Sequence, residues 1–207
     1  MAKYIEPKYE ILTKIDKESF LLSCELAART CYKSENNITE GSAEKLIKNL
    51  IKNKHLAMVE HCPNITVKFI CDRAFSHELV RHRLCSFAQE SQRYCKYENN
   101  DMEFIIPYWM YESRDIEERN MFYDVCHLTE QKYKELREKG LQAQAARCVL
   151  PNAVKTEIVV TANIREWRHL LQLRTAKDAH PEMQRIMRPL LEELKEKLPV
   201  FFEDITY

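Results

Sequence analysis

The scarcity of glycine limits what this chain can fold into more than any other feature of its sequence. Only Gly41 and Gly140 occur among the 207 residues. Dinucleotide-binding folds use a G-x-G-x-x-G turn, and phosphate-binding loops use G-x-x-x-x-G-K-[ST]. Neither motif can be written with these two glycines, so we expect side chains to hold the phosphates of any nucleotide that the protein binds.

The charge balance argues against several other classes of protein. Lys+Arg and Asp+Glu both number 32, so no overall basic field attracts nucleic acid or an anionic membrane surface. The amino terminus lacks the apolar segment of a signal peptide, and no run of about 18 apolar residues occurs. We therefore predict a cytoplasmic protein that has neither a membrane nor a nucleic acid as its partner.

The eight cysteines are scattered along the chain without a C-x-x-C pair. This spacing is typical of reduced, mostly buried thiols rather than of a zinc site or a disulfide framework. We expect no metal site.

The hydrophobic pattern predicts both helices and strands. Apolar residues alternate over 64–71, 102–106 and 156–162, which favours strands. Helical spacing predicts helices over 18–32, 43–51, 72–83, 115–139, 142–150, 163–174 and 181–198. The expected N-caps of the first three are Asp16, either Ser42 or Thr39, and Asp72. The side chains expected to face the core include Val125, Leu173, Met183, Met187, Leu190, Leu191 and Leu194. No Pro/Gly/Ser-rich linker divides the chain, so we expect one domain over residues 1–207. Its fold class is expected to be α+β, with a central mixed or antiparallel sheet flanked by long helices.

One polar stretch, RHRLCSFAQESQRY, is unusually rich in groups that bind anions. It places Arg81, His82 and Arg83 in tandem and continues seven residues later with Ser91. A simpler interpretation exists, because cations at the C-terminal end of a helix over 72–83 would stabilise its dipole by about 0.3–1 kcal/mol each. The continuation beyond Arg83 has too few turn residues for a simple connector, which weakens that interpretation.

A second cationic group follows in the carboxy-terminal half and comprises Arg147, Asn163, Arg165, His169 and Arg174. Guanidinium groups bind phosphate through two parallel hydrogen bonds, so they suit a nucleotide site that lacks a glycine loop. Two clusters suggest two anionic ligands. Arg147 lies in an apolar segment and is expected either to be buried with an anionic partner or to be exposed; Arg165, Arg168 and His169 could instead form a solvated helix face.

The pattern RHR-x7-S resembles the signature of the flavin-dependent thymidylate synthases. Further blocks match that family in the same order, so the resemblance covers nearly the whole chain. These blocks are AARTCY (27–32), HLAMVEH (55–61), ARCVLP (146–151), TANIREWRHLLQLR (161–174) and the downstream His180.

The resemblance implies an enzyme of dTMP biosynthesis that carries out the reductive methylation of dUMP to dTMP. FAD would be the bound cofactor, with NADPH and 5,10-methylenetetrahydrofolate as co-substrates that give the electrons and the carbon. The flavin and the folate supply the difficult chemistry, and the protein supplies orientation and electrostatics. The family also implies a homotetramer whose active sites lie between subunits.

Roles carried over from the family fall into three groups. Arg174 is the expected catalytic residue, because it would stabilise uracil ionised at N3 and so enrich the electron density at C5. The residues expected to contact FAD are His55, Ala57, Arg81, His82, Arg83, Leu84, Gln89, Asn163, Arg165 and His169. Those expected to contact dUMP are Glu78, Leu79, Val80, Arg81, Gln89, Glu90, Ser91, Gln92, Arg93, Arg174 and, from a neighbouring subunit, Arg147.

Several positions depart from the family pattern. Gln89 replaces a carboxylate, Cys31 and Ala57 stand where hydroxyl side chains are common, and the spacing from Arg174 to His180 is long. Ser91 is expected to bind the nucleotide rather than to act as a nucleophile, because no base is evident near it. Two other classes remain open: a nucleic-acid-binding module and a helical interaction protein.

Overall fold

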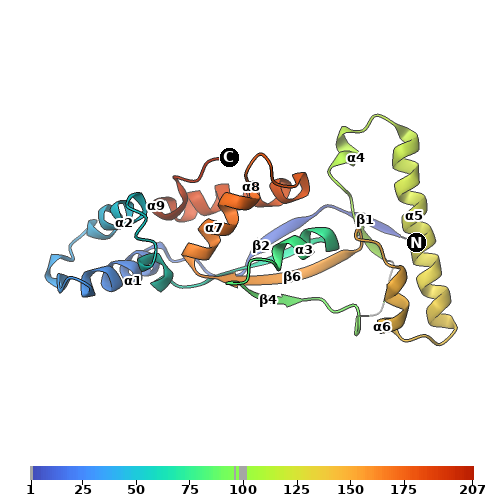
Figure 1. The fold of residues 1–207 in the computed structure, drawn as a ribbon, viewed down its shortest axis with the longest axis horizontal. Helices are drawn as coiled ribbons and strands as arrows, with labels where there is room; N and C mark the ends of the chain where they lie inside the picture. Colours follow the sequence, from blue (N-terminus) through green and yellow to red (C-terminus); the bar gives the residue numbers. More distant parts are fainter. Residues whose placement is uncertain (1, 96, 98–101) are drawn as a thin grey trace. The chain divides into compact units, whose positions relative to one another are not determined.

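The structure is a computed structural model that describes residues 2–95, 97 and 102–207. Helices and strands alternate irregularly along the chain, which confirms the α+β class (Figure 1). The elements, with η for 3-10 helices, are β1 (Lys3–Ile5), β2 (Lys8–Ile11), α1 (Lys17–Thr30), η1 (Glu35–Asn37), α2 (Ser42–Lys52), η2 (Met58–His61), β3 (Ile65–Asp72), α3 (Arg73–Leu79), β4 (Ser86–Gln89), β5 (Glu103–Ile105), α4 (Trp109–Glu112), α5 (Ile116–Glu138), α6 (Ala143–Ala146), η3 (Arg147–Val149), β6 (Lys155–Ala162), α7 (Ile164–Arg174), α8 (Pro181–Lys197) and α9 (Pro199–Phe202).

The chain packs as two compact units. Unit 1 comprises Met1–Lys8, Phe69–Arg81 and Phe87–Val159. Unit 2 comprises Tyr9–Lys68, His82–Ser86 and Val160–Tyr207. The stretch RHRLCSFAQESQRY therefore contributes residues to both units.

The strands of the described residues form two small sheets. The larger has the strand order β2-β3-β6-β4, and β1 pairs in parallel with β5. In β3 and β6 every second residue is buried, as their alternating sequences predict. The predicted strand over 102–106 is confirmed by β5. The short strands β1, β2 and β4 were not predicted, because three or four residues are too few for a period of two to be recognised.

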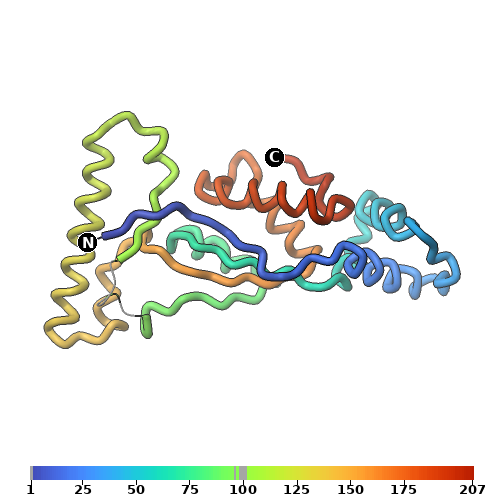
Figure 2. The backbone as a smooth tube through the Cα atoms, turned by 180° about the vertical axis from the view of Figure 1, so that it is seen from behind, coloured from blue at the N-terminus to red at the C-terminus, as the bar shows by residue number. Residues whose placement is uncertain are grey.

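Unit 2 is mainly helical. Helix α1 packs against α2 and η2, and α7 packs against α8 and α9, as the tube in Figure 2 also shows. Trp167 lies at the centre, fully buried, and its indole Nε1–H donates to the Ile65 carbonyl at 2.9 Å. The predicted inward face of the last helix is confirmed, since Met183, Met187, Leu190, Leu191 and Leu194 are all fully buried.

Unit 1 is organised around the long helix α5. Asp115 accepts a hydrogen bond from the Glu117 amide at its start, and Gly140 adopts a left-handed conformation (φ 90°) just beyond its end. Cys126 and Tyr133 face a core that also contains Met102 and Phe104. Val125, expected in this buried stripe, is 53% exposed, because only a narrow face of α5 is covered within the unit.

Three local expectations were wrong. Helix α3 ends at Leu79 and not at Arg83. The residue that precedes α2 as its N-cap is Gly41, with φ 73°, where we expected Ser42 or Thr39. Leu173, expected to face the core from α7, is 50% exposed.

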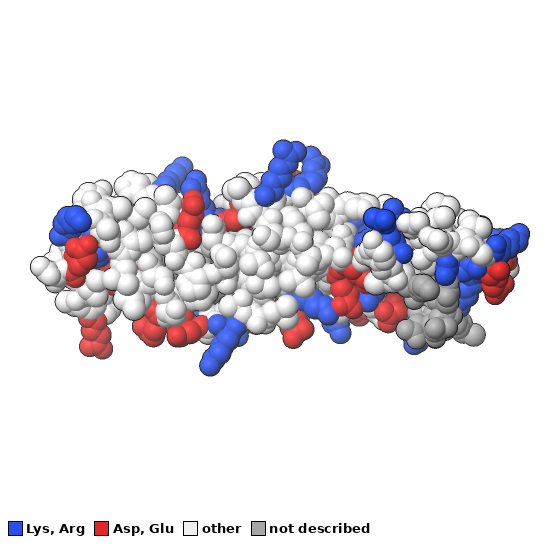
Figure 3. All heavy atoms as spheres, turned by 90° about the horizontal axis from the view of Figure 1, so that it is seen from below, with Lys and Arg blue, Asp and Glu red and all other residues white. Residues whose placement is uncertain are grey.

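The surface carries charges of both signs. On the face drawn in Figure 3, basic and acidic side chains are interspersed, and its described residues form no continuous basic stripe. Among residues 2–95, 97 and 102–207, no helix has both the length and the apolar character needed to cross a membrane. The eight cysteines, all of which lie among the described residues, form no disulfides; five are buried and three, Cys31, Cys95 and Cys148, are exposed. This confirms the prediction of mostly buried thiols.

Candidate functional site

The tandem cations lie in a turn. After α3 ends, the Arg81 amide donates to the Glu78 carbonyl and the Cys85 amide donates to the His82 carbonyl. The side chains then diverge: His82 is buried, whereas Arg81, Arg83 and Leu84 are exposed. Local spacing alone predicts that the helix continues to Arg83. In the fold, His82 is buried against α7, and this long-range contact accounts for the earlier end of the helix.

In unit 2 the turn and α7 bring three of the predicted site residues together. The Nε–H of Arg174 donates to Nε2 of His82 at 3.0 Å, although the two residues lie 92 positions apart. The rings of His82 and His169 meet edge to face, with centroids 5.9 Å apart. Glu166 completes the group, with Oε1 3.7 Å from His82 Nδ1 and 3.9 Å from Cys85 Sγ.

This group is electrostatically unusual. Burial, together with the nearby charges of Arg174 and His169, lowers the pKa of His82 to about 4, so its imidazole is neutral at pH 7. Burial also raises the pKa of the Cys85 thiol to about 12, helped by Glu166. Burial likewise raises the pKa of Glu166 above its ordinary value. Clusters of shifted groups of this kind are frequent at functional sites.

The start of α7 holds two more predicted residues. The Asn163 side chain caps the helix by accepting from the Glu166 amide at 3.0 Å. Arg165 is exposed and pairs with Glu60, and His169 is also exposed. The alternative of a solvated helix face is therefore correct for Arg165 and His169. It is wrong for Arg168, which is 3% exposed and forms two 2.7 Å hydrogen bonds with Asp204.

A pocket of about 600 Å³ in unit 2 contains His55 and Ala57. Its other walls come from the end of α1, from α2 and from Met58, and most of its lining is apolar. The lining residues are Ala28, Arg29, Cys31, Tyr32, Ser34, Leu46, Leu50, His55, Ala57 and Met58. The pocket therefore combines apolar surface with a few polar groups, which is the usual character of a cofactor site.

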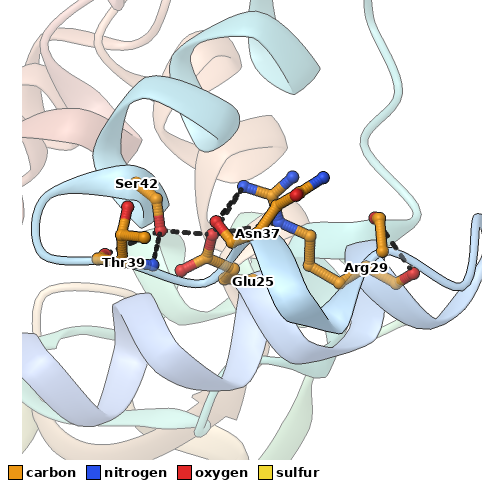
Figure 4. A network of polar contacts seen from close by, with 6 residues as sticks. Glu25, Arg29, Asn37, Thr39 and Ser42 are labelled. Carbon is orange, nitrogen blue, oxygen red and sulfur yellow. Dashed lines mark hydrogen bonds and ion pairs between the residues drawn. The ribbon is translucent and has the colours of Figure 1, made fainter.

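A polar network holds one wall of this pocket in place (Figure 4). Buried Glu25 accepts from Arg29 Nη2 at 3.0 Å and from Ser42 Oγ at 2.7 Å. Ser42 Oγ in turn accepts from the Thr39 amide at 3.0 Å. These bonds join α1 to the segment that leads into α2, and they fix Arg29 at the edge of the pocket.

In unit 1 a second network supports the segment expected to bind dUMP. Gln89 Nε2 donates to Ser76 Oγ at 2.8 Å and to Thr156 Oγ1 at 3.2 Å. Arg73 Nη1 donates to the same Thr156 oxygen at 3.0 Å and to the Glu90 carbonyl at 3.4 Å. Lys155 Nζ lies 3.4 Å from the Glu90 carboxylate. The position where the family pattern has a carboxylate thus uses its amide as a donor.

The remaining predicted residues differ in exposure. Leu79 is fully buried, Glu78 is half-buried and Val80 is 40% exposed. Ser91 and Gln92 are half-buried in a turn in which the Cys95 amide donates to the Ser91 carbonyl. Arg93 is exposed and lies over the Tyr94 ring. Of the alternatives for Arg147, the exposed one is correct.

Sequence reasoning assigned no site role to four residues of these groups. Cys85 and Glu166 belong to the group around His82, and Arg73 and Thr156 belong to the network around Gln89. Glu166 carried one usable signal, since it stands three residues after the N-cap Asn163, where a glutamate often closes a capping box. The others lie on elements whose local pattern indicates only helix, strand or core.

Comparison with known proteins identifies the family. The model of the family described as Thy1, thymidylate synthase complementing protein, matches residues 15–200. A flavin-dependent thymidylate synthase from Corynebacterium aurimucosum is 34% identical over 195 residues, covering 87% of this chain and 78% of the relative. One from Pyrococcus furiosus is 34% identical over 166 residues, covering 79% and 67%.

A solved structure shares the fold. The UMP/dUMP methylase PolB from Streptomyces cacaoi, bound with 5-Br dUMP, superimposes with a TM-score of 0.83 at 24% identity, and the match covers 97% of this chain and 95% of the other. At that identity the likeness supports the fold alone. Together with the family match over residues 15–200, the identities to the two relatives show that this chain belongs to the thymidylate synthase complementing proteins, the flavin-dependent thymidylate synthases that its motifs resemble.

Proposed function

We propose that this protein converts dUMP to dTMP by reductive methylation, with FAD as cofactor, 5,10-methylenetetrahydrofolate as carbon donor and NADPH as reductant. Its family membership supports the reaction class. The observation that carries the proposal is the hydrogen bond from Arg174 to His82, because it joins the two cationic motifs of the sequence in unit 2. A cation held in this way can stabilise negative charge on a bound pyrimidine.

The residues of unit 2 fit a flavin nucleotide. The pocket beside His55 and Ala57 offers apolar surface for a ring, and the exposed Arg83 and Arg165 offer charge for phosphates. When bound, FAD supplies the transfer of reducing equivalents. The protein's own part is to bind, orient and exclude water.

We assign the nucleotide substrate to residues of both motifs. Arg93 pairs with the dUMP phosphate and Ser91 donates a hydrogen bond to the nucleotide. Arg174 stabilises uracil ionised at N3, so that C5 becomes electron-rich enough to attack the methylene carbon. Ser91 Oγ accepts from the Arg93 amide at 3.3 Å, a contact that favours a role in the binding turn over one as a nucleophile.

The assembly belongs to the proposal as well. We infer one functional domain over residues 1–207 and a homotetramer in the cytoplasm, in which Arg147 of one subunit reaches dUMP bound by another. The exposure of Arg147 is compatible with that role. Cross-linking and light scattering of the purified protein would test the tetramer.

The direct test is spectroscopic and enzymatic. Purified protein, as isolated or after addition of FAD, is expected to show a bound flavin absorbance that NADPH bleaches without oxygen. Supplied with dUMP, 5,10-methylenetetrahydrofolate and NADPH, it should form dTMP. Arg174→Ala should keep FAD and lose dTMP formation. A colourless protein that does not take up added FAD would contradict the proposal. If such a colourless protein also bound random DNA in a salt-sensitive way, the nucleic-acid-binding alternative would be favoured.

A further inference from the structure

A buried line of polar contacts in unit 2 ends on Arg174. From the surface inward, Arg174 Nε contacts His82 Nε2, and His82 Nδ1 faces Glu166 Oε1. His82 is 6% exposed and Glu166 5% exposed. Glu166 is not among the residues assigned to a ligand, although it lies on α7 between Arg165 and His169, which are.

The direction of the hydrogen bond fixes the proton on His82. An arginine Nε always carries its hydrogen, so it can only donate. His82 Nε2 must therefore present its lone pair to Arg174, and the proton of the neutral ring sits on Nδ1. His82 Nδ1 lies 3.7 Å from Glu166 Oε1, a distance too long for a direct hydrogen bond but short enough for the carboxylate charge to attract the N–H dipole in a buried site.

We propose that Glu166 is a positioning residue for Arg174: its carboxylate holds His82 as the Nδ1–H tautomer, and His82 in turn fixes the Nε–H edge of the Arg174 guanidinium. The role of Arg174 in the reaction rests on the function proposed above. The role of Glu166 rests on the geometry of His82.

This arrangement restricts how a ligand meets Arg174. While Nε–H is bonded to His82, a ligand can be recognised only through the terminal Nη groups. A guanidinium held along one edge also loses less rotational freedom when it binds. The line of contacts therefore selects one orientation of the cation before the nucleotide arrives, and preorganised charge is the main source of electrostatic catalysis.

Glu166 lies in a rigid part of unit 2, as a residue that positions another side chain must. Its amide is bonded to the N-cap Asn163 in the first turn of α7, next to the fully buried Trp167. The charged and titratable groups around the carboxylate are His82 and Cys85 from the turn, and Arg165 and His169 from α7.

The test reads the tautomer of His82 directly. The full-length protein, labelled with ¹⁵N in histidine and saturated with FAD, is examined by long-range ¹H–¹⁵N NMR, with His82→Asn used to assign the signal. We expect the Nδ1–H form in the wild type. Glu166→Gln and Glu166→Leu should each populate the Nε2–H form in part, because the carboxylate that favours Nδ1–H is gone and only the Arg174 hydrogen bond still favours it. Glu166→Gln keeps the size of the side chain, so it remains informative if the leucine variant does not fold.

Glu192→Gln is the control, because Glu192 is another carboxylate of unit 2 whose side chain is 50% exposed and pairs with Lys195 at 2.9 Å. This control should keep the wild-type tautomer and stay within about twofold of its kcat. The two Glu166 variants should bind FAD normally and lose about 10- to 100-fold in kcat for dTMP formation, the loss expected from a misplaced group.

Each outcome separates the two proposals. An Nε2–H form in the wild type, or an unchanged Nδ1–H form in both Glu166 variants, overturns the positioning role. Absence of dTMP formation by the wild type contradicts the proposed function and leaves the NMR result valid as a test of Glu166.

Discussion

At the scale of single residues, Thr156 carries more interactions than its size suggests. Its side chain is 2% exposed, and its hydroxyl oxygen accepts from both Arg73 and Gln89. Ser76 Oγ, the other acceptor of Gln89, already donates to the Arg73 carbonyl at 3.0 Å. A glutamate at position 89 would therefore face a Ser76 oxygen whose proton is in use, which explains why an amide suits this position.

Replacing Thr156 by valine tests that network. Thr156→Val keeps the branched shape that suits a strand but removes the buried hydroxyl that accepts from Arg73 and Gln89. We expect a loss of about 1.5–3 kcal/mol in the free energy of unfolding, measured in urea, because one of the bonds comes from a charged group.

Thr161→Val on the same strand is the control. Among the residues that the structure describes, its hydroxyl bonds to the Thr66 hydroxyl alone, at 2.9 Å, and the residue is half-buried. It should cost less than about 1 kcal/mol. Equal losses for the two variants would show that the Arg73–Gln89 network contributes nothing specific.

At the scale of elements, the helix starts differ in how they are capped. Asp72 accepts from the Phe75 amide at 2.6 Å at the start of α3. Asp16 holds the corresponding position before α1 but makes no side-chain capping bond. Both aspartates were expected as caps from sequence, so only the geometry distinguishes them.

This difference predicts unequal effects of alanine. Asp72→Ala should destabilise the protein by about 0.5–2 kcal/mol, because an amide of the first turn loses its acceptor. Asp16→Ala should change stability by no more than about 0.5 kcal/mol. Chemical denaturation of both variants measures the difference, and a larger loss for Asp16→Ala would contradict the assignment.

The elements also show what local pattern can predict. Strands β3 and β6 and helices α5 and α8 follow from periodicity and from their flanking residues, because each buries a regular face. The end of α3 does not, because it depends on His82 reaching Arg174, 92 positions away. The burial of Arg168 likewise depends on Asp204, 36 positions away. The motifs named candidate site residues, whose roles stay predictions, and the fold brings His82, His169 and Arg174 together. The contacts of Glu166 with the His82 turn and of Arg73 with Thr156 became visible only in the fold.

At the scale of the whole molecule, a partly buried ion pair within unit 2 holds the C-terminal segment in place. Arg168 on α7 bonds to both carboxylate oxygens of Asp204 and to the Phe201 carbonyl. The hydrogen bonds from Arg168 hold the pKa of Asp204 below its ordinary value of 3.8. A lowered carboxyl pKa stabilises the folded state at neutral pH, and this contribution disappears as the pH falls through the folded-state pKa.

Asp204→Asn should therefore reduce stability in a pH-dependent way. At pH 7 we expect a loss of about 1–3 kcal/mol, because a buried guanidinium loses its charged partner. The difference between wild type and variant should shrink as the pH is lowered below about 4. Unfolding curves between neutral and acidic pH measure it.

Glu203→Gln provides the comparison from the neighbouring residue. Glu203 pairs with Lys48 at 3.1 Å, and both side chains are exposed. Exposed pairs contribute about 0–1 kcal/mol. The role of the Asp204 charge would be contradicted if Asp204→Asn lowered the free energy of unfolding equally at all pH values. It would also be contradicted if Glu203→Gln lowered the free energy of unfolding by the same amount.

The exposed thiol of Cys31 gives the pocket of unit 2 a built-in chemical reporter. Cys31 lines the pocket together with His55 and Ala57, whereas the other exposed cysteines, Cys95 and Cys148, do not belong to its lining. A fluorescent maleimide would thus label three sites, only one of which a ligand in the pocket can shield. In a protein in which Cys95 and Cys148 are replaced by serine, the labelling rate at Cys31 would measure occupancy of the pocket for any compound, coloured or not.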